Sequence, residues 1–203
     1  MIMLLAATSA PAALYTETFN GVNTAIPDGN PAGVTISGTV SDVAAGYPVL
    51  GLTVTLSING GYNGDLYAYL VAPNGTRVGL MNQPGVGVNG FGASGAGMNI
   101  TLQDAATVNG SIQNETGGAV LSGAYNAAGS LANFNGSVAD GTWTLFFADM
   151  SSGGGTSTLN SWSLEITAVP EPVTTALGIF FGLAAVRWFF GKCRNYKAAG
   201  RRI

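Results

Sequence analysis

Residues 50–59 read LGLTVTLSIN, in which apolar residues alternate strictly with small or polar ones. A period of two over ten residues is the pattern of a β-strand with one buried face and one exposed face. The following residues, 59–64, read NGGYNG, and Asn and Gly accept the backbone angles of tight turns. The stretch therefore predicts a long, half-buried strand that ends in a turn.

Strand patterns continue on both sides of this stretch. Residues 66–72 are apolar on both faces, which predicts a central strand, and the PNG turn at 73–75 predicts a hairpin into residues 76–81. Apolar alternations also fall at Val34, Ile36 and Val40, at Trp143, Leu145 and Phe147, and at Trp162, Leu164 and Ile166. Because no segment before residue 173 has a helical period, we predict an all-β domain, a β-sandwich or jelly roll.

Two long stretches interrupt the strand patterns. Residues 83–97 are rich in glycine with few apolar residues, and residues 109–135 are irregular. We predict that both are surface loops. Loops of this length in a compact domain are commonly functional or mobile, and composition alone does not decide between these two roles.

The composition is that of an exported β domain. Charged residues make up 8% of the chain, against about 25% in ordinary soluble domains, and glycine is abundant at 31 residues. Between residues 13 and 168 one cation, Arg77, stands against nine carboxylates, which gives a net charge of −8. This balance excludes nucleic acid and anionic lipid head groups as partners. The one cysteine, Cys193, lies near the C-terminus, so the domain has no disulfide.

The C-terminal end has a three-part order. Residues 169–172 read VPEP, an apolar stretch over 173–186 extends through Arg187 to 190, and a basic tail follows over 191–203. Six of the seven Lys and Arg residues stand here: Arg187, Lys192, Arg194, Lys197, Arg201 and Arg202. Basic residues flanking an apolar segment stay on the cytoplasmic side, and a spanning helix needs about 20 residues. We therefore predict a single transmembrane helix over 173–190 with the tail inside. A plain anchor and a buried helix are the alternatives.

The order of Pro-Glu-Pro, apolar helix and basic end resembles the PEP-CTERM sorting signal of Gram-negative bacteria. Members of that family are processed by exosortase, a membrane-embedded transpeptidase-like enzyme, and are associated with exopolysaccharide and biofilm matrix. The resemblance implies a protein that passes through the inner membrane to the cell surface or extracellular matrix. The processing and sorting residues that it implies are Val169, Pro170, Glu171, Pro172, Arg187, Lys192, Arg194, Arg201 and Arg202. Thr174 and Thr175, early in the apolar stretch, depart from the family pattern.

The N-terminal end agrees with export. Residues 1–7 are apolar, and Ala10-Pro11-Ala12 offers the small residues that a signal peptidase reads. No Lys or Arg precedes the apolar run, so we interpret residues 1–12 as the remnant of a signal peptide whose basic start lies upstream. The alternative is the start of a cytoplasmic protein. The expected organisation is thus a remnant at 1–12, a sandwich at 13–168 and a sorting signal at 169–203.

A second resemblance covers residues 26–167. The motifs, in chain order, are Ile26-Pro27-Asp28, Gly64-Asp65-Leu66, the stretch 70–76, Asp140-Gly141-Thr142-Trp143 and Leu159-Asn160-Ser161-Trp162. This series is similar to the P domain (P/Homo B) that follows the catalytic domain in proprotein convertases and many bacterial subtilases. The resemblance implies a jelly-roll β-sandwich and an accessory role beside a serine peptidase.

The residues themselves argue against catalysis. A subtilase needs an imidazole to take the serine proton and return it to the leaving group, and the chain contains no histidine. A Ser–Lys pair would need a lysine, and residues 13–168 contain none. No spacing of carboxylates indicates a glycosidase pair. We therefore predict that the protein is not an enzyme, although a peptidase label can be inherited from the P-domain family.

Three aspartates are candidate calcium ligands. Asp65, Asp104 and Asp149 each stand where a predicted strand meets a loop, a place where hard oxygen ligands can converge. The alternative is that they cap turns by accepting local backbone N–H bonds. Trp143 and Trp162 either pack in the core or serve as sugar-stacking platforms. No spacing predicts zinc, which needs His or Cys.

Two functions from different classes are consistent with these patterns. The first is an exported, non-catalytic sandwich that is structural or adhesive in an exopolysaccharide or biofilm layer, with an exosortase-type enzyme and the membrane as transient partners. The second is an accessory binding module of a separate exported serine peptidase or other hydrolase. Exosortase and exopolysaccharide genes nearby favour the first, and a hydrolase gene nearby favours the second.

Overall fold

The computed structural model describes residues 11–106 and 108–169. Residues Ala12–Val169 form one compact unit. The predicted Pro-Glu-Pro motif, apolar helix and basic tail, and most of the signal-peptide remnant, lie outside the described residues. Within the described part of the chain, no helix is long and apolar enough to cross a membrane.

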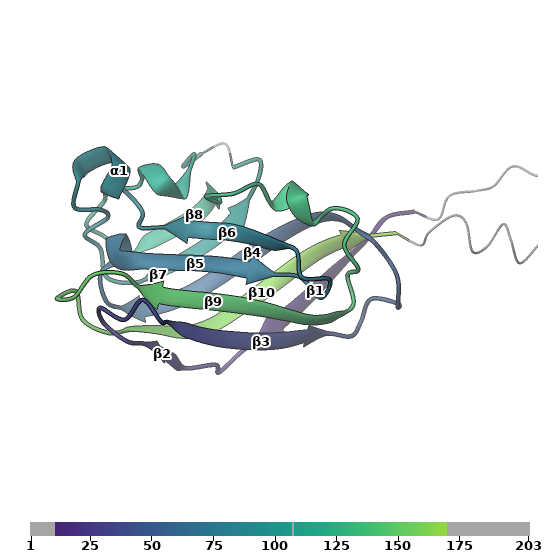
Figure 1. Cartoon of the computed structure of the whole chain (residues 1–203). Helices are drawn as coiled ribbons and strands as arrows, with labels where there is room; N and C mark the ends of the chain where they lie inside the picture. Colours follow the sequence, from purple (N-terminus) through teal and green to yellow (C-terminus); the bar gives the residue numbers. More distant parts are fainter. Residues whose placement is uncertain (1–10, 107, 170–203) are drawn as a thin grey trace, which may run out of the picture. The chain divides into compact units, whose positions relative to one another are not determined.

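The described chain forms two β-sheets (Figure 1). The larger sheet contains, in spatial order, β1 (Ala13–Phe19), β10 (Ser157–Ala168), β4 (Val49–Gly60), β7 (Met98–Gln103) and β8 (Leu121–Asn126), with β2 (Thr24–Ile26) also paired to β10. The smaller sheet contains β3 (Val34–Val40), β9 (Gly141–Asp149), β5 (Leu66–Val71) and β6 (Arg77–Asn82). Neighbouring strands are antiparallel except β7 and β8, which are parallel. The predicted all-β sandwich is confirmed.

Four short helical elements lie in the connections between strands. They are η1 (Asn63–Asp65), α1 (Val86–Asn89), η2 (Ile112–Asn114) and η3 (Leu131–Phe134). The stretches 83–97 and 109–135 are thus ordered by single helical turns and, in the second, by β8, which the sequence pattern did not predict.

The stretch 50–59 lies within β4 as predicted, with one exception to its alternation. Leu52, Val54 and Leu56 point into the core and are almost fully buried, whereas Leu50 is 48% exposed. The pairing with β10 explains this, because consecutive residues of β10 pair with residues 51 and 49 of β4, which leaves Leu50 as an extra residue. A β-bulge of this kind turns the extra side chain away from the face that the alternation predicts.

The central position predicted for residues 66–72 is confirmed, since β5 lies between β9 and β6. Its outward residues Tyr67 and Tyr69 are half-buried because they pack with Phe146 of β9; the rings of Tyr69 and Phe146 are stacked with centroids 4.6 Å apart. Arg77 of β6 lies over the Tyr69 ring at 5.0 Å. An aromatic stack on the outer face therefore accounts for a strand that is apolar on both sides.

The two tryptophans pack in the core rather than on the surface. Trp143 and Trp162 are 0% and 1% exposed. The indole N–H of Trp143 donates to the Ala139 carbonyl at 3.0 Å, and its ring meets Phe134 edge to face. The ring of Phe19 packs on Trp162 with centroids 4.3 Å apart. Neither indole face is available to stack on a sugar.

The chain enters and leaves the sandwich at the same end. Ala13 at the start of β1 pairs with Ala168 at the end of β10. The loops 27–32, 60–65, 83–97 and 150–156 gather at the opposite end, which we call the loop end (Figure 1). The 12 residues of β10 connect the two ends, a distance of about 40 Å at 3.4 Å per residue.

Candidate functional site

Two adjacent strand ends bring Asp65 and Asp149 together at the loop end. Asp65 is the last residue of η1, directly before β5, and Asp149 is the last residue of β9. The register pairs Leu66 of β5 with Asp149, and the Met150 N–H donates to the Asp65 carbonyl at 2.8 Å. The sequence prediction placed both residues where a strand meets a loop, and the sheet makes these two junctions neighbours.

Asp28 joins them from the loop after β2. Both of its carboxylate oxygens accept from the Gly153 N–H at 3.1 Å, which ties the loop 27–32 to the loop 150–156. We call Asp28, Asp65 and Asp149 the acidic cluster. The sequence analysis did not select Asp28 as a ligand, although it stands in the quoted motif Ile26-Pro27-Asp28.

Asp149 carries an unsatisfied buried oxygen. Its side chain is 0% exposed, and Oδ1 accepts from the N–H groups of Gly29 at 3.3 Å and Ser151 at 3.1 Å. Oδ2 is buried without a hydrogen-bond partner. A buried carboxylate oxygen without a partner is costly, so Oδ2 is an atom at which a cation would relieve an energetic penalty.

The pKa of Asp65 is raised by its burial and by the neighbouring carboxylates. Asp65 is 9% exposed, and its pKa is raised from 3.8 to about 6, first by burial and then by the negative charges of Asp149 and Asp28. A hydrogen bond with Ser151 opposes the rise in pKa. The cluster thus holds several carboxylates in a partly dry place. Among the residues that the structure describes, the one cation, Arg77, lies at the other end of β6 and does not balance them.

Glycines let the loops close over the cluster. A Cβ atom at Gly154 would lie 2.9 Å from Oδ2 of Asp65, and a Cβ atom at Gly29 would lie 2.9 Å from the Cβ atom of Ser152. Gly29 also has a φ of 61°, which favours glycine. A side chain at either position would push the loops away from the carboxylates.

The cluster partly fits a calcium site. Carboxylate oxygens at strand ends, one of them unsatisfied, are the donors that calcium prefers. The described residues nevertheless contain no group of three or more His, Cys, Asp or Glu side chains arranged to hold a metal ion. Calcium here would therefore take Asp65 and Asp149, and complete its shell with backbone carbonyls or water.

Asp104 lies apart from the cluster, beyond the end of β7. Its carboxylate accepts from the Ser130 hydroxyl at 3.0 Å and from the N–H groups of Leu131 at 2.7 Å and Ala132 at 2.6 Å. Asp104 thus caps the start of η3 from 26 to 28 residues away, whereas the alternative stated for these aspartates was capping through local backbone N–H bonds. The structure therefore brings together two of the three predicted ligands.

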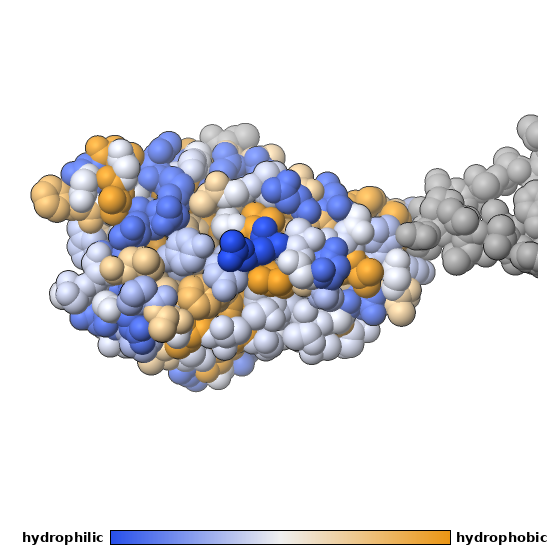
Figure 2. Space-filling view, in the orientation of Figure 1, coloured by the Kyte–Doolittle hydropathy of each residue, from blue (hydrophilic) through white to orange (hydrophobic). Residues whose placement is uncertain are grey.

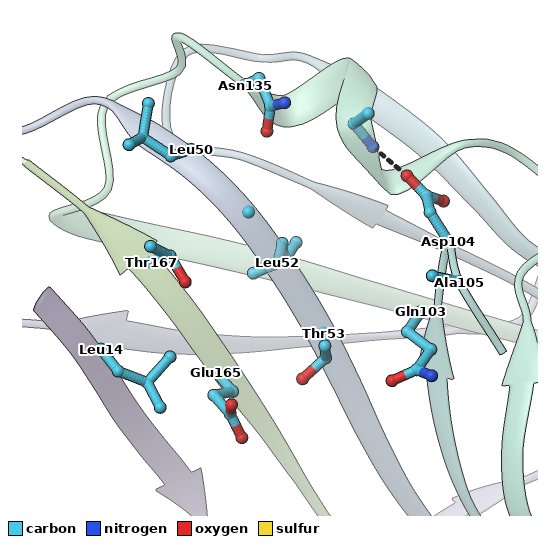
Figure 3. Close-up of a pocket in the computed structure, with 12 residues that line it drawn as sticks. Leu14, Leu50, Leu52, Thr53, Gln103, Asp104, Ala105, Asn135, Glu165 and Thr167 are labelled. Carbon is cyan, nitrogen blue, oxygen red and sulfur yellow. Dashed lines mark hydrogen bonds between the residues drawn. The ribbon is translucent and has the colours of Figure 1, made fainter. Parts of the chain in front are cut away.

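A groove of about 320 Å³ lies on the outer face of the larger sheet (Figure 3). Leu14 and Leu50, which are 61% and 48% exposed, line it together with Gln103, Glu165 and Asn135. Asp104 forms part of its wall, held by the hydrogen bond to the start of η3. The lining offers amide, hydroxyl and carboxylate groups beside aliphatic carbon, a mixture that suits a hydroxyl-rich ligand and supplies no imidazole, amine or thiol.

Comparison with protein families gave a match. A family model described as the proprotein convertase P-domain matches residues 49–166. Comparison with the curated proteins gave no match.

Two solved structures are similar to the chain. One is the Aeromonas sobria serine protease in complex with its chaperone, with 17% identity and a TM-score of 0.50 over 80% of this chain and 28% of that chain. The other is the serine protease of Aeromonas sobria, with 18% identity and a TM-score of 0.49 over 78% of this chain and 27% of that chain. The chain spans just over a quarter of the length of these proteases, and the first likeness is one of fold.

Proposed function

The chain belongs to the proprotein convertase P-domain family, and on that premise we propose that its jelly-roll sandwich is a non-catalytic accessory module of a separate exported hydrolase. The observation that carries the proposal is that the family match spans β4 to β10 in a chain that contains no histidine. A serine peptidase is the first candidate for the hydrolase, because the family model is that of the proprotein convertase P-domain and a structure of similar fold contains a serine protease.

The proposed module contributes stability and positioning, not a reacting group. A peptidase of the subtilase type needs a base to activate its serine, and residues 13–168 contain no His, Lys or Cys. The carboxylates of the acidic cluster bind the loops 27–32 and 150–156 through Gly29, Ser151 and Gly153. Their role in this proposal is to hold the loop end in one conformation.

Calcium is the proposed cofactor of the loop end. The support is the unsatisfied Oδ2 of Asp149, the pKa of about 6 at Asp65 and the excess of carboxylates over cations. Bound calcium would supply the positive charge that the cluster lacks and would connect β5, β9 and the loop after β2. The proposed ligands are Asp65 and Asp149, with Asp28 beside them.

Export and sorting complete the proposal. Residues 169–203 would act as a PEP-CTERM signal read by an exosortase-type enzyme, which would deliver the module through the inner membrane to the surface of a Gram-negative cell. The support for this part of the proposal is the order of Pro-Glu-Pro, apolar stretch and basic tail in the sequence.

A structural or adhesive role in exopolysaccharide is the second candidate. The observation that favours it is the groove on the outer face of the larger sheet, with Gln103, Asn135 and Glu165 beside exposed leucines. Purified exopolysaccharide from the producing cell should then bind the protein and lose affinity when Gln103→Ala and Glu165→Ala are combined. Equal binding of exopolysaccharide by wild type and the double variant would contradict a binding role for the groove.

The experiment that tests the accessory role is deletion of the gene in the producing cell. Exported peptidase or other hydrolase activity should then decay faster, and the full-length gene supplied in trans should restore its lifetime. Unchanged exported activities in the deletion strain would contradict the accessory role.

A further inference from the structure

The connection between β6 and β7 exposes two apolar side chains at the loop end. Phe91 is 80% exposed and Val88 is 60% exposed. The other aromatic side chains of the described residues are buried or half-buried. Figure 2 shows apolar colour at the tip of the end where Figure 1 draws α1. An exposed Phe is unfavourable in water unless something covers it.

The loop that carries Phe91 is held in one conformation. Oδ1 of Asn89 accepts from the N–H groups of Phe91 at 2.8 Å and Gly92 at 2.6 Å, and its Nδ2 donates to the Gly92 carbonyl at 3.1 Å. The Gly90 N–H donates to the Val86 carbonyl at 2.9 Å and closes α1. The loop around Phe91 therefore already has a fixed conformation in the unbound protein, which lowers the entropic cost of binding a partner.

A second set of hydrogen bonds fixes the base of the loop. The Gln113 side chain accepts from the Asn82 N–H at 2.9 Å and donates to the Asn82 carbonyl at 2.6 Å. The Gly85 N–H donates to the Gln113 carbonyl at 2.9 Å. The end of β6, the loop and η2 are thus connected into one unit.

The loop shares its support with the acidic cluster. The Gly64 N–H donates to the Ala93 carbonyl at 2.9 Å, and Asp65 is the next residue. A Cβ atom at Gly64 would lie 2.8 Å from the Cα atom of Gly92, so the backbones of η1 and the loop are in direct contact. The backbone of the loop that carries Phe91 therefore lies against η1, the element that carries the buried Asp65.

The charge at the loop end is negative. Asp28 is exposed on one side, and the half-buried Glu115 packs through its backbone against Gly85 at the start of the loop. The only cation between residues 13 and 168, Arg77, pairs with Val71 at the far end of β6. A partner that covers this surface must offer an apolar pocket with basic residues around it.

We propose that Val88 and Phe91 form the anchor by which the loop end docks into a protein partner that has an apolar pocket rimmed by Lys or Arg. The inference rests on the proposed accessory role, in which that partner is an exported hydrolase. Preorganised aromatic side chains are typical of interface hot spots, and the acidic Asp28 and Glu115 at the same end of the domain are complementary to a basic rim on the partner. An anionic membrane is a poorer occupant, because the surface has no basic side chain to attract it. In a second copy of this chain, residues 13–168 carry the same net charge of −8, so the two domains repel each other.

The test places the photoreactive residue p-benzoylphenylalanine at position 91 of the full-length chain in the producing cell. A matched strain carries it at position 108, where Val108 is 88% exposed in the connection between β7 and β8. We expect one defined protein adduct from position 91 that is absent from position 108, with the cross-linked peptide containing Lys or Arg. An adduct to lipid, an adduct to a second copy, or no adduct at position 91 would overturn the proposal.

Binding to the cross-linked protein is then measured with purified components. Phe91→Ser should weaken the complex at least about tenfold, Val108→Ser should leave it within about twofold, and salt should weaken the wild-type complex. Because Phe91 lies in solvent, Phe91→Ser should melt at the wild-type temperature. A hydrolase that binds wild type and Phe91→Ser equally contradicts the anchor and leaves the accessory role intact. A partner that is not a hydrolase, and that loses affinity with Phe91→Ser, contradicts the accessory role and supports the anchor.

Discussion

The side chain of Asn63 forms two hydrogen bonds with the backbone of Gly97. Its Nδ2 donates to the Gly97 carbonyl at 2.9 Å, and its Oδ1 accepts from the Gly97 N–H at 3.0 Å. Asn63 is 0% exposed, so the amide replaces a pair of strand hydrogen bonds in a dry place. It joins η1, which carries Asp65, to the start of β7.

Asn63→Ala should therefore destabilise the fold. The substitution leaves the buried N–H of Gly97 without a partner, whereas the Gly97 carbonyl keeps its hydrogen bond from the Leu121 N–H at 3.2 Å, and we expect the free energy of unfolding to fall by about 1–3 kcal/mol. Urea denaturation followed by circular dichroism measures this change. Asn133→Ala is the matched control, because the Asn133 side chain is exposed. A loss equal to that of the control would contradict the role of Asn63.

The acidic cluster should make the calcium-free protein less stable as the pH rises. The pKa of Asp65 is raised by burial, Asp149 and Asp28 from 3.8 to about 6, so folding favours the protonated acid. This contribution to stability is present below pH 3.8 and is lost as the pH rises through about 6.

In chelator, Asp65→Asn should remove that dependence and raise the free energy of unfolding at pH 7 by about 1–3 kcal/mol. Urea titrations at pH 4.5 and pH 7 test the prediction. The same change in stability between the two pH values in wild type and Asp65→Asn would contradict it.

Calcium should raise the melting temperature of the exported domain. An ion that binds only the folded protein stabilises it by mass action, and Asp65→Ala or Asp149→Ala should abolish the effect of adding calcium. Asp104→Ala is the control: it loses the cap of η3, worth about 1 kcal/mol, and should keep the response to calcium. A melting temperature that is the same in calcium and in chelator would leave the aspartates as residues that cap turns.

Processing at the C-terminal end should give a mature protein that ends close to Val169. The Pro-Glu-Pro order at 170–172 and the basic tail motivate this prediction. Mass spectrometry of protein extracted from the cell surface reads the terminal residue directly. Peptides covering Trp188 to Lys192 in the same mature pool would support a permanent anchor instead.

The sequence predicted β4 and β5 best, because in these strands the burial of side chains determines the residue pattern. In β4 the burial of one face imposes the alternation from Leu52 to Ile58, and in β5 the stack of Tyr69 on Phe146 accounts for its second apolar face. The bulge at Leu50 was not predictable from the sequence alone, because it depends on the pairing of β4 with β10. Local patterns report burial, and register depends on the partner strand.

In the candidate site, too, local sequence predicted the positions of residues along the chain but not which of them lie close together. The positions of Asp65 and Asp149 at strand ends could be read from the sequence, but their proximity follows from the pairing of β5 with β9. Asp104 has the same local signature and lies elsewhere, engaged with the start of η3. Asp28 was not selected because its place in the cluster depends on hydrogen bonds between distant loops. Residue type and spacing thus could not distinguish a cap from a cluster member.

The most direct test of the accessory role is the lifetime of exported hydrolase activity in culture fluid of the deletion strain, measured with and without added purified full-length protein. The account predicts that the activity decays quickly and that added wild-type protein slows the decay. It also predicts that the protein alone hydrolyses nothing, because the chain has no histidine and residues 13–168 have no Lys or Cys to activate a nucleophile. A decay that the added protein does not change, or turnover by the protein alone that disappears when one aspartate is replaced, would contradict it.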